Sequence, residues 1–229
     1  MKIVALLPMK ANSERVKGKN FKCLEGRPLF KWILDTLLAV PEIDLIVINT
    51  DAKAILSKNG LIDNERILVR DRKLEICGDF VSMNKIINDD ITNVDADIYL
   101  MTHTTNPLLR KSSIELAIEK YKVALKNKEA DSLFTVNNIQ ERFYDKNAKP
   151  VNHDPNKLIR TQDLEPWYKE NSSLYLFNKK SFAASGARIG KKPIMLETEP
   201  YESIDIDTPA DWDLAEILIQ YYQNKGIIE

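Results

Sequence analysis

A cationic loop follows the first apolar run of this sequence. Ile3 to Leu7 is continuously apolar, and residues 8–20 (PMKANSERVKGKN) then supply four cationic side chains before a helix predicted to start near Pro28. In an open α/β sheet, a loop between the carboxyl end of a strand and the next helix presents N–H groups and cations to a ligand. The order of these segments predicts a binding site for the polyphosphate of a nucleotide.

Within this loop we expect two kinds of cationic residue. Lys10 and Lys19 are the candidate phosphate-binding cations, and Ser13 adds a neutral hydrogen-bond donor. Nucleotidyl transfer places additional negative charge on the α-phosphate oxygens and on the departing pyrophosphate, so fixed cations aimed at those oxygens lower the barrier. Arg15 and Lys17 are interpreted as a solvated face.

A pair of carboxylates near the end of the chain is the candidate metal site. Asp205 and Asp207 flank Ile206, and the two-residue period of a strand would put both carboxylates on one face, roughly 7 Å apart. Mg²⁺ favours one or two carboxylates together with substrate phosphates and water, so the pair suits a nucleotide-bound Mg²⁺. The alternative is the solvated end of a strand, which is the commoner role of an Asp-x-Asp pair on its own.

The composition restricts the class of protein. A chain of 229 residues with 44% hydrophobic content is expected to form one domain, residues 1–229. A net charge of −1, from 33 basic and 34 acidic side chains, argues against a general nucleic-acid surface. No apolar stretch approaches the roughly 20 residues of a membrane-spanning helix, and no secretory pattern is seen, so we expect a cytoplasmic protein with no membrane partner. Cys23 and Cys77 are expected to be unpaired thiols.

Apolar runs alternate with amphipathic segments through the first 140 residues. This alternation predicts a Rossmann-like three-layer α/β/α sandwich with a mostly parallel sheet. The predicted strands are 3–7, 45–48, 67–69, 98–101, 133–136, 174–177 and 194–196. The predicted helices are 28–39, 52–58, 81–91, 112–126 and 209–222, the last with Thr208 as N-cap and Pro209 at its first position.

The alternation fails between Gln140 and Asn171. Prolines interrupt a polar stretch that also contains two pairs of adjacent aromatic residues, Phe143 with Tyr144 and Trp167 with Tyr168. A solitary loop of this length is unusual in a compact domain. A disordered insert is the alternative, although its aromatic content argues against disorder.

Six blocks of the sequence follow the order of a known family. Five residues of the first loop fall in the frame of the signature Pro-Ala-Arg-x-x-Ser-Lys-x-x-x-x-Lys-Asn: Pro8, Lys10, Ser13, Lys19 and Asn20. The other blocks are Arg72 to Asp79 with Ser82, Thr105 to Leu108, Arg160 to Gln162, Asn171 to Tyr175, and Asp205 to Pro209. Over nearly its whole length the chain resembles the acylneuraminate (sialic acid) cytidylyltransferases, also called CMP-sialic acid synthetases.

The resemblance implies an enzyme that uses CTP, Mg²⁺ and an acidic 2-keto sugar, whose anomeric hydroxyl attacks the α-phosphate and expels pyrophosphate. It implies nucleotide binding by Lys10, Ser13, Lys19, Asn20, Arg72 and Ser82. It implies sugar binding by His103, Thr105, Arg160, Gln162, Asn171 and Tyr175. Lys10, Lys19 and Asp207 would be catalytic, and Asp205 and Asp207 would hold the metal. The region 140–171 would be an extended arm that reaches over the other subunit of a homodimer.

The sequence departs from the family at positions that concern substrate binding. Lys10 stands where the family usually has Arg, which keeps the charge but loses the planar fork. His103 stands where the family usually has Gln; it follows a predicted strand and would hydrogen-bond sugar or base, although a lone histidine is more often structural. Residues 79–82 have an alternative role as the start of a helix capped by Asp79.

The sequence leaves three candidate functions. The preferred one is transfer of CMP to a nine-carbon acid such as a sialic, legionaminic or pseudaminic acid, for cell-surface polysaccharide. The second is a 3-deoxy-manno-octulosonate cytidylyltransferase, whose Arg-Leu-Pro-x-Lys pattern fits less well than Lys19 and Asn20. The third is a nucleotide-sugar binding protein that keeps the fold without turnover, because fold alone does not establish activity.

Overall fold

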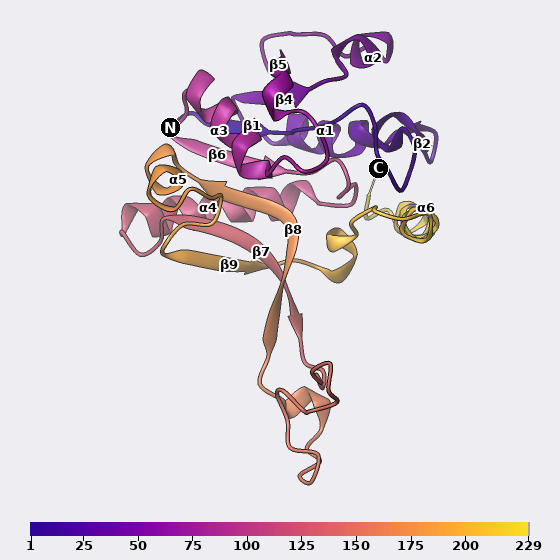
Figure 1. The fold of residues 1–229 in the computed structure, drawn as a ribbon, viewed down its shortest axis with the longest axis vertical. Helices are drawn as coiled ribbons and strands as arrows, with labels where there is room; N and C mark the ends of the chain where they lie inside the picture. The colour runs from indigo at the N-terminus through magenta and orange to yellow at the C-terminus, as the bar shows by residue number, and fades with distance from the viewer. Residues whose placement is uncertain (229) are drawn as a thin grey trace.

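Strands buried on both faces form the centre of the structure, a computed structural model that describes residues 1–228 (Figure 1). The sheet has seven strands in the order β5-β4-β1-β6-β8-β7-β9. Their bounds, in that order, are Ile67–Asp71, Leu45–Thr50, Ile3–Leu6, Ile98–Thr102, Trp167–Phe177, Ser132–Ile139 and Pro193–Glu197. Only β8 runs antiparallel to its neighbours, so the predicted, mostly parallel sheet is confirmed. A separate two-stranded sheet joins β2 (Cys23–Leu24) to β3 (Arg27–Pro28).

Helices cover both faces of the sheet, which confirms the predicted three layers. One face packs against α1 (Leu29–Ala39), α2 (Lys53–Lys58) and α4 (Lys111–Lys126). The other packs against α3 (Met83–Asn93) and α5 (Lys179–Ser185). Alternate residues of each strand enter the two cores, because side chains in a strand point to opposite faces. Short 3₁₀ helices are Lys19–Phe21, Leu74–Ile76, Thr161–Asp163 and Pro200–Ser203.

The C-terminal helix α6 (Pro209–Asn224) forms a third, smaller core. Trp212 and Ile219 of this helix cluster with Trp32 of α1, and Ile206 is fully buried in the same cluster. Thr208 accepts a hydrogen bond from the Asp211 N–H, and Pro209 follows it, which confirms the predicted helix start. The packing fixes the segment just before α6 against the body of the sheet.

The N-cap of α3 is Ser82, which accepts from the Asn84 N–H, and Asp79 lies outside the helix, so Asp79 as a cap is wrong. Cys23 and Cys77 are free thiols. Within residues 1–228, no helix combines the length and the apolar character needed to cross a bilayer.

The segment between β7 and β8 extends away from the body as a ribbon with a folded tip (Figure 1). The outer halves of β7 and β8 pair from Val136 with Glu170 to Ile139 with Trp167. At the tip, the rings of Phe143 and Trp167 stack with centroids 5.3 Å apart. The region 140–171 is therefore an ordered hairpin extension, here called the arm; its role in a dimer stays a prediction.

An irregularity in strand pairing, here called the bulge, separates the arm from the sheet. The register of β7 and β8 shifts between Phe134 and Val136, and Ser172 takes a positive φ of 60° inside the bulge. The buried Asn171 bridges the bulge with its side chain. The side-chain carbonyl oxygen accepts from the Thr135 hydroxyl at 2.6 Å, and the side-chain amide donates to Thr198 at 2.9 Å. Asn171 thus joins β8 to β7 and to the residue that follows β9 at the base of the arm.

Asn171→Ala should destabilise the fold by about 2 kcal/mol, because it removes the shorter acceptor of the buried Thr135 hydroxyl and the acceptor of the Ser173 N–H in the bulge. Urea unfolding followed by circular dichroism measures this change. The control is Asn138→Ala, since Asn138 is exposed on the same ribbon and makes only a long contact of 3.4 Å to Glu197. Equal stability of the two variants would contradict this role of Asn171.

Candidate active site

A cavity of about 360 Å³ lies at the carboxyl ends of β1 and β6. These two neighbouring strands mark the point where the chain order of the sheet reverses, which is where open α/β sheets bind ligands. Four segments line the cavity: the cationic loop at 8–20, residues 72–86, residues 103–105 and Asp207. The tertiary structure therefore brings most of the predicted site residues to one place.

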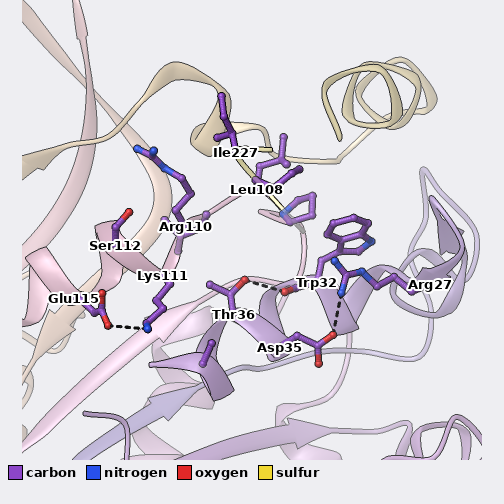
Figure 2. A pocket seen from close by; sticks show the side chains of 14 residues that line it. Arg27, Trp32, Asp35, Thr36, Leu108, Arg110, Lys111, Ser112, Glu115 and Ile227 are labelled. Carbon is purple, nitrogen blue, oxygen red and sulfur yellow. Dashed lines mark hydrogen bonds and ion pairs between the residues drawn. The ribbon is translucent and has the colours of Figure 1, made fainter. Parts of the chain in front are cut away.

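A second cavity, of about 440 Å³, lies between α1, α4 and the last described residues (Figure 2). Its charged side chains pair with one another, as Arg27 does with Asp35 at 3.2 Å and Lys111 with Glu115 at 3.4 Å. The cavity at the strand ends has the stronger claim to chemistry, because it combines the switch point with the cationic loop.

Lys19 is the most deeply placed cation of the loop. Its side chain is only 9% exposed, and its ammonium group donates to the carbonyl oxygen of Ile206 and to Asp207 Oδ1, the latter at 3.2 Å. Gly18, at a positive φ of 61°, starts the 3₁₀ turn that carries Lys19 into this position. Lys19 thus connects the first loop of the chain to the segment before α6.

Asn20 holds the cationic loop closed. Its amide donates to the carbonyl oxygen of Lys10 at 2.8 Å, and its carbonyl oxygen accepts from the Thr104 hydroxyl at 2.6 Å. Asn20 is buried, and both contacts are internal. In this structure it positions the loop relative to the end of β6.

Lys10 pairs with Asp79 across the cavity. The hydrogen bond and the charge of Lys10 hold the pKa of Asp79 below its usual range. Ser13 lines the cavity beside this pair. Lys10 and Ser13 therefore both line the cavity. Asp79, from the segment between β5 and α3, is the acidic partner of Lys10.

Asp207 lies between two cations. Arg15 contacts its Oδ2 at 2.7 Å, and Lys19 contacts its Oδ1. Arg15 lines the cavity although it is largely exposed, so the structure adds it to the site. Lys17 is exposed and is not among the lining residues, as expected of a solvated face.

Asp205 and Asp207 lie in a loop between the 3₁₀ helix Pro200–Ser203 and α6, and not in a strand as the sequence analysis assumed. Burial raises the pKa of Asp205, the charge of Asp207 adds to this effect, and a hydrogen bond from Thr105 opposes it. In residues 1–228 no group of three or more His, Cys, Asp or Glu side chains is arranged to hold a metal.

Arg72 lines the cavity and braces its wall. Its guanidinium group donates to the carbonyl oxygen of Met9 at 3.0 Å and to the side-chain and backbone oxygens of Asn49 at 2.9 and 2.7 Å. Burial lowers the pKa of Arg72, and nearby acids oppose that effect. Ser82 caps α3 and lies between the lining residues Val81 and Met83.

His103 faces a cation that sequence reasoning missed. Arg188, from the loop between α5 and β9, contacts Nε2 of His103 at 3.3 Å and donates to the Tyr175 hydroxyl at 2.9 Å. Burial and the charge of Arg188 lower the pKa of His103 to about 3. Burial raises the pKa of Tyr175 to about 12. His103 is therefore neutral at physiological pH, and Arg188 connects it to the Tyr175 hydroxyl.

Two predicted sugar-binding residues lie away from the cavity of their own chain. Arg160 pairs with Asp163 at 2.7 Å, and the backbone oxygen of Gln162 accepts from Gln140. All four residues belong to the arm, which projects from the body (Figure 1). Asn171 lies in the bulge at its base, as described above. None of Arg160, Gln162 and Asn171 is among the residues that line the cavity.

The comparisons with known proteins identify the family. The family model described as "Cytidylyltransferase" matches residues 4–228, which is nearly the whole chain. The chain belongs to this family of CTP-dependent nucleotidyltransferases, and the resemblance inferred from the six sequence blocks is confirmed.

Characterised relatives in this family span the chain. The CMP-N,N′-diacetyllegionaminic acid synthase of Legionella pneumophila is 29% identical, over 97% of this chain and 98% of its own length. The pseudaminic acid cytidylyltransferase of Campylobacter jejuni is 25% identical, over 95% and 96%. N-acylneuraminate cytidylyltransferase A of Danio rerio is 28% identical over 93% of this chain, which spans only half of that protein.

Solved structures share the fold. A CMP-2-keto-3-deoxy-manno-octonic acid synthetase complexed with CTP superposes with a TM-score of 0.66 at 14% identity, over 96% of this chain and 99% of the other. The 4-diphosphocytidyl-2C-methyl-D-erythritol synthase of Anaerococcus prevotii gives 0.65 at 15% identity, over 96% of each chain. At these identities the likeness concerns the fold alone.

The neutral state of His103 should make folding sensitive to acid. Its folded pKa of about 3 lies below the usual value of about 6.5, so between these values the unfolded chain binds one more proton. Stability from this source is complete above pH 6.5 and falls as the pH falls. The melting-temperature difference between the parent and His103→Gln should therefore shift against the parent on going from pH 7.5 to pH 5, and a constant difference would contradict this assignment.

Proposed function

We propose that this protein transfers CMP from CTP to a 2-keto acid sugar of the nine-carbon class, which includes sialic, legionaminic and pseudaminic acids. Membership of the cytidylyltransferase family and the names of the full-length relatives support the proposal. The observation that carries it is the meeting of Lys10, Arg15, Lys19 and Asp207 in one cavity at the switch point of the sheet.

In the proposed reaction, the oxygen of the sugar's anomeric hydroxyl forms a bond to the α-phosphorus, and the bond from that phosphorus to pyrophosphate breaks. The hydroxyl proton is lost to solvent. Lys10 and Lys19 stabilise the charge that grows on the phosphate oxygens, and the low exposure of Lys19 strengthens its effect. Asn20 and Arg72 keep the cavity wall in place and so preserve the orientation of these cations.

We propose Mg²⁺ as the cofactor, with Asp207 and Asp205 as the residues that would hold it. One or two carboxylates beside phosphate suit Mg²⁺. Burial raises the pKa of Asp205, the charge of Asp207 adds to this effect, and a bound cation would offset both. When bound, Mg²⁺ would neutralise phosphate charge and help pyrophosphate depart.

Two alternatives remain. The eight-carbon acid 3-deoxy-manno-octulosonate is the second substrate candidate, and a synthetase for that class shares the fold. A binding protein without turnover is the third candidate. A cytoplasmic location and a supply role for cell-surface polysaccharide stay predictions of the sequence.

Pyrophosphate release tests the function directly. The purified protein is incubated with CTP, Mg²⁺ and a panel of eight- and nine-carbon 2-keto acids, with UTP and ATP as nucleotide controls. We expect release only with CTP and a nine-carbon acid, together with the CMP-sugar mass. Binding of CTP without release for any acid would favour the non-catalytic alternative.

Lys19→Ala should lower turnover about 100-fold or more, because a fixed cation on transferring phosphate acts most strongly in the transition state. Lys17→Ala is the matched control, since Lys17 carries the same charge two residues earlier and does not line the cavity. Steady-state kinetics with CTP measure both. Similar turnover for the two variants would remove Lys19 from the catalytic set.

Asp207→Asn should abolish most transfer at any Mg²⁺ concentration while changing the melting temperature little, because the side chain is about 41% exposed. Asp205→Asn should act more mildly. Initial rates against Mg²⁺ concentration, with chelator as the zero point, give the comparison. Near-parental rates of Asp207→Asn at saturating Mg²⁺ would remove the metal assignment.

We further propose a homodimer in which the arm of one copy reaches the cavity of the other. The arm presents exposed apolar side chains, including Tyr144, Leu158, Trp167 and Tyr168. Arg160, near the tip, would then be able to bind the acidic sugar of the partner, because its bidentate fork suits a carboxylate.

Trp167→Ala and Tyr168→Ala should weaken the dimer and lower activity together, because a few buried aromatics dominate such interfaces. Tyr221→Ala is the control, since Tyr221 is more exposed than Trp167 and Tyr168 but lies on α6. Analytical ultracentrifugation at assay concentration gives the mass. A parent protein that is fully active as a monomer would contradict the proposal, and the arm would then be a lid for its own cavity.

A further inference from the structure

The loop between α5 and β9 places one cation against the wall of the cavity. We infer that Arg188 is a positioning residue, which fixes His103 with its proton on Nδ1 so that His103 offers an N–H donor to an oxygen of the acidic sugar. The inference rests on the proposed function, because it assigns a role within the same cavity. It concerns a residue for which the sequence blocks gave no role.

The hydrogen-bonding rules of the two side chains decide the tautomer. A guanidinium group only donates, so the ring nitrogen that faces Arg188 Nη1 at 3.3 Å, Nε2, must accept through its lone pair. In a neutral ring the proton then sits on Nδ1. Nδ1 has no hydrogen-bonding partner within residues 1–228, and His103 lines the cavity. A donor is therefore available to a ligand there.

Arg188 is itself held rigidly. Its guanidinium group stacks on the Tyr175 ring, 3.8 Å from the centroid, and donates to the Tyr175 hydroxyl. Glu170 lies 3.6 Å away and balances the charge, and it also accepts from the Tyr175 hydroxyl. The Arg188 side chain is 20% exposed. These contacts come from the outer and inner halves of β8, on either side of the bulge, and leave the guanidinium little freedom to turn away from His103.

Burial keeps His103 neutral, and two of the three charges around it act in the same direction. Arg188 and Lys19 oppose its protonation, and Asp207 favours it but is already paired with Lys19 and Arg15. Burial adds to the opposing side. Because Nε2 is occupied by Arg188 and the ring is neutral, His103 is not a general base; it is a hydrogen-bond donor of fixed orientation.

Nitrogen-15 NMR of the imidazole rings tests the geometry without any substrate. The chain has two histidines, so His103→Gln assigns the spectrum. In the parent, His103 should show the neutral Nδ1–H pattern from about pH 5.5 to about pH 8. In Arg188→Met, which keeps a flexible apolar chain over Tyr175, the Nε2–H form should become populated and the ring should titrate. An Nε2–H form in the parent would overturn the inference.

Kinetics test the consequence through a double-mutant cycle. Arg188→Met should raise the KM for the acid sugar about tenfold, through one misdirected hydrogen bond, and leave the KM for CTP within about twofold. Glutamine at position 103 provides an N–H donor that needs no tautomer, so the same change in the His103→Gln background should have almost no effect. Arg188→Lys, which retains a donor cation, should recover part of the loss.

An equal effect of Arg188→Met in both backgrounds would overturn the inference, because Arg188 would then act on the substrate or on the fold directly. Thermal melting of each variant separates loss of fold from loss of positioning. If no sugar of the panel yields a CMP-sugar with the parent, the proposed function fails, whereas the NMR result still decides the tautomer.

Discussion

The buried ammonium group of Lys19 joins two segments that lie 187 residues apart in the chain. It donates to the backbone of Ile206 and to Asp207, so the cationic loop and the acidic segment share one fixed point. Ile206 is fully buried under α6, and Asn20 ties the same loop to the end of β6. The junction therefore fixes Lys19 and Asp207 relative to each other in the cavity.

The cavity contains both cations and carboxylates, and ion pairs between them balance their charges. Asp207 offsets the charges of Lys19 and Arg15, and Asp79 offsets that of Lys10. Under the proposed function, a triphosphate would enter a cavity whose cations are already oriented, and its oxygens would replace carboxylate oxygens. Such prior orientation reduces the reorganisation that accompanies the reaction.

The arm and the cavity are linked through β8. Its outer half pairs with β7 in the arm, and its inner half carries Tyr175, which supports Arg188. The bulge at Asn171 changes the register between these two halves. One strand thereby connects a surface proposed to meet a second copy with the wall proposed to meet the sugar.

The sequence by itself determined the local features and the family. The apolar alternation predicted the layers and most element bounds, because buried strands and amphipathic helices follow from side-chain periodicity. The order of six short blocks predicted the cytidylyltransferase family, which the match over residues 4–228 confirms. Thr208 and Pro209 marked the start of α6 correctly, since a cap depends on neighbouring residues.

Only the tertiary structure decided which side chains meet. Arg188 lies in a loop with no recognisable motif, and it reaches His103, 85 residues away, because antiparallel pairing places β8 beside β6. Asp79 pairs with Lys10 instead of capping α3, and Arg15 joins Asp207, because long side chains choose partners by distance in the fold. Such contacts depend on how the elements pack, which local sequence patterns do not encode.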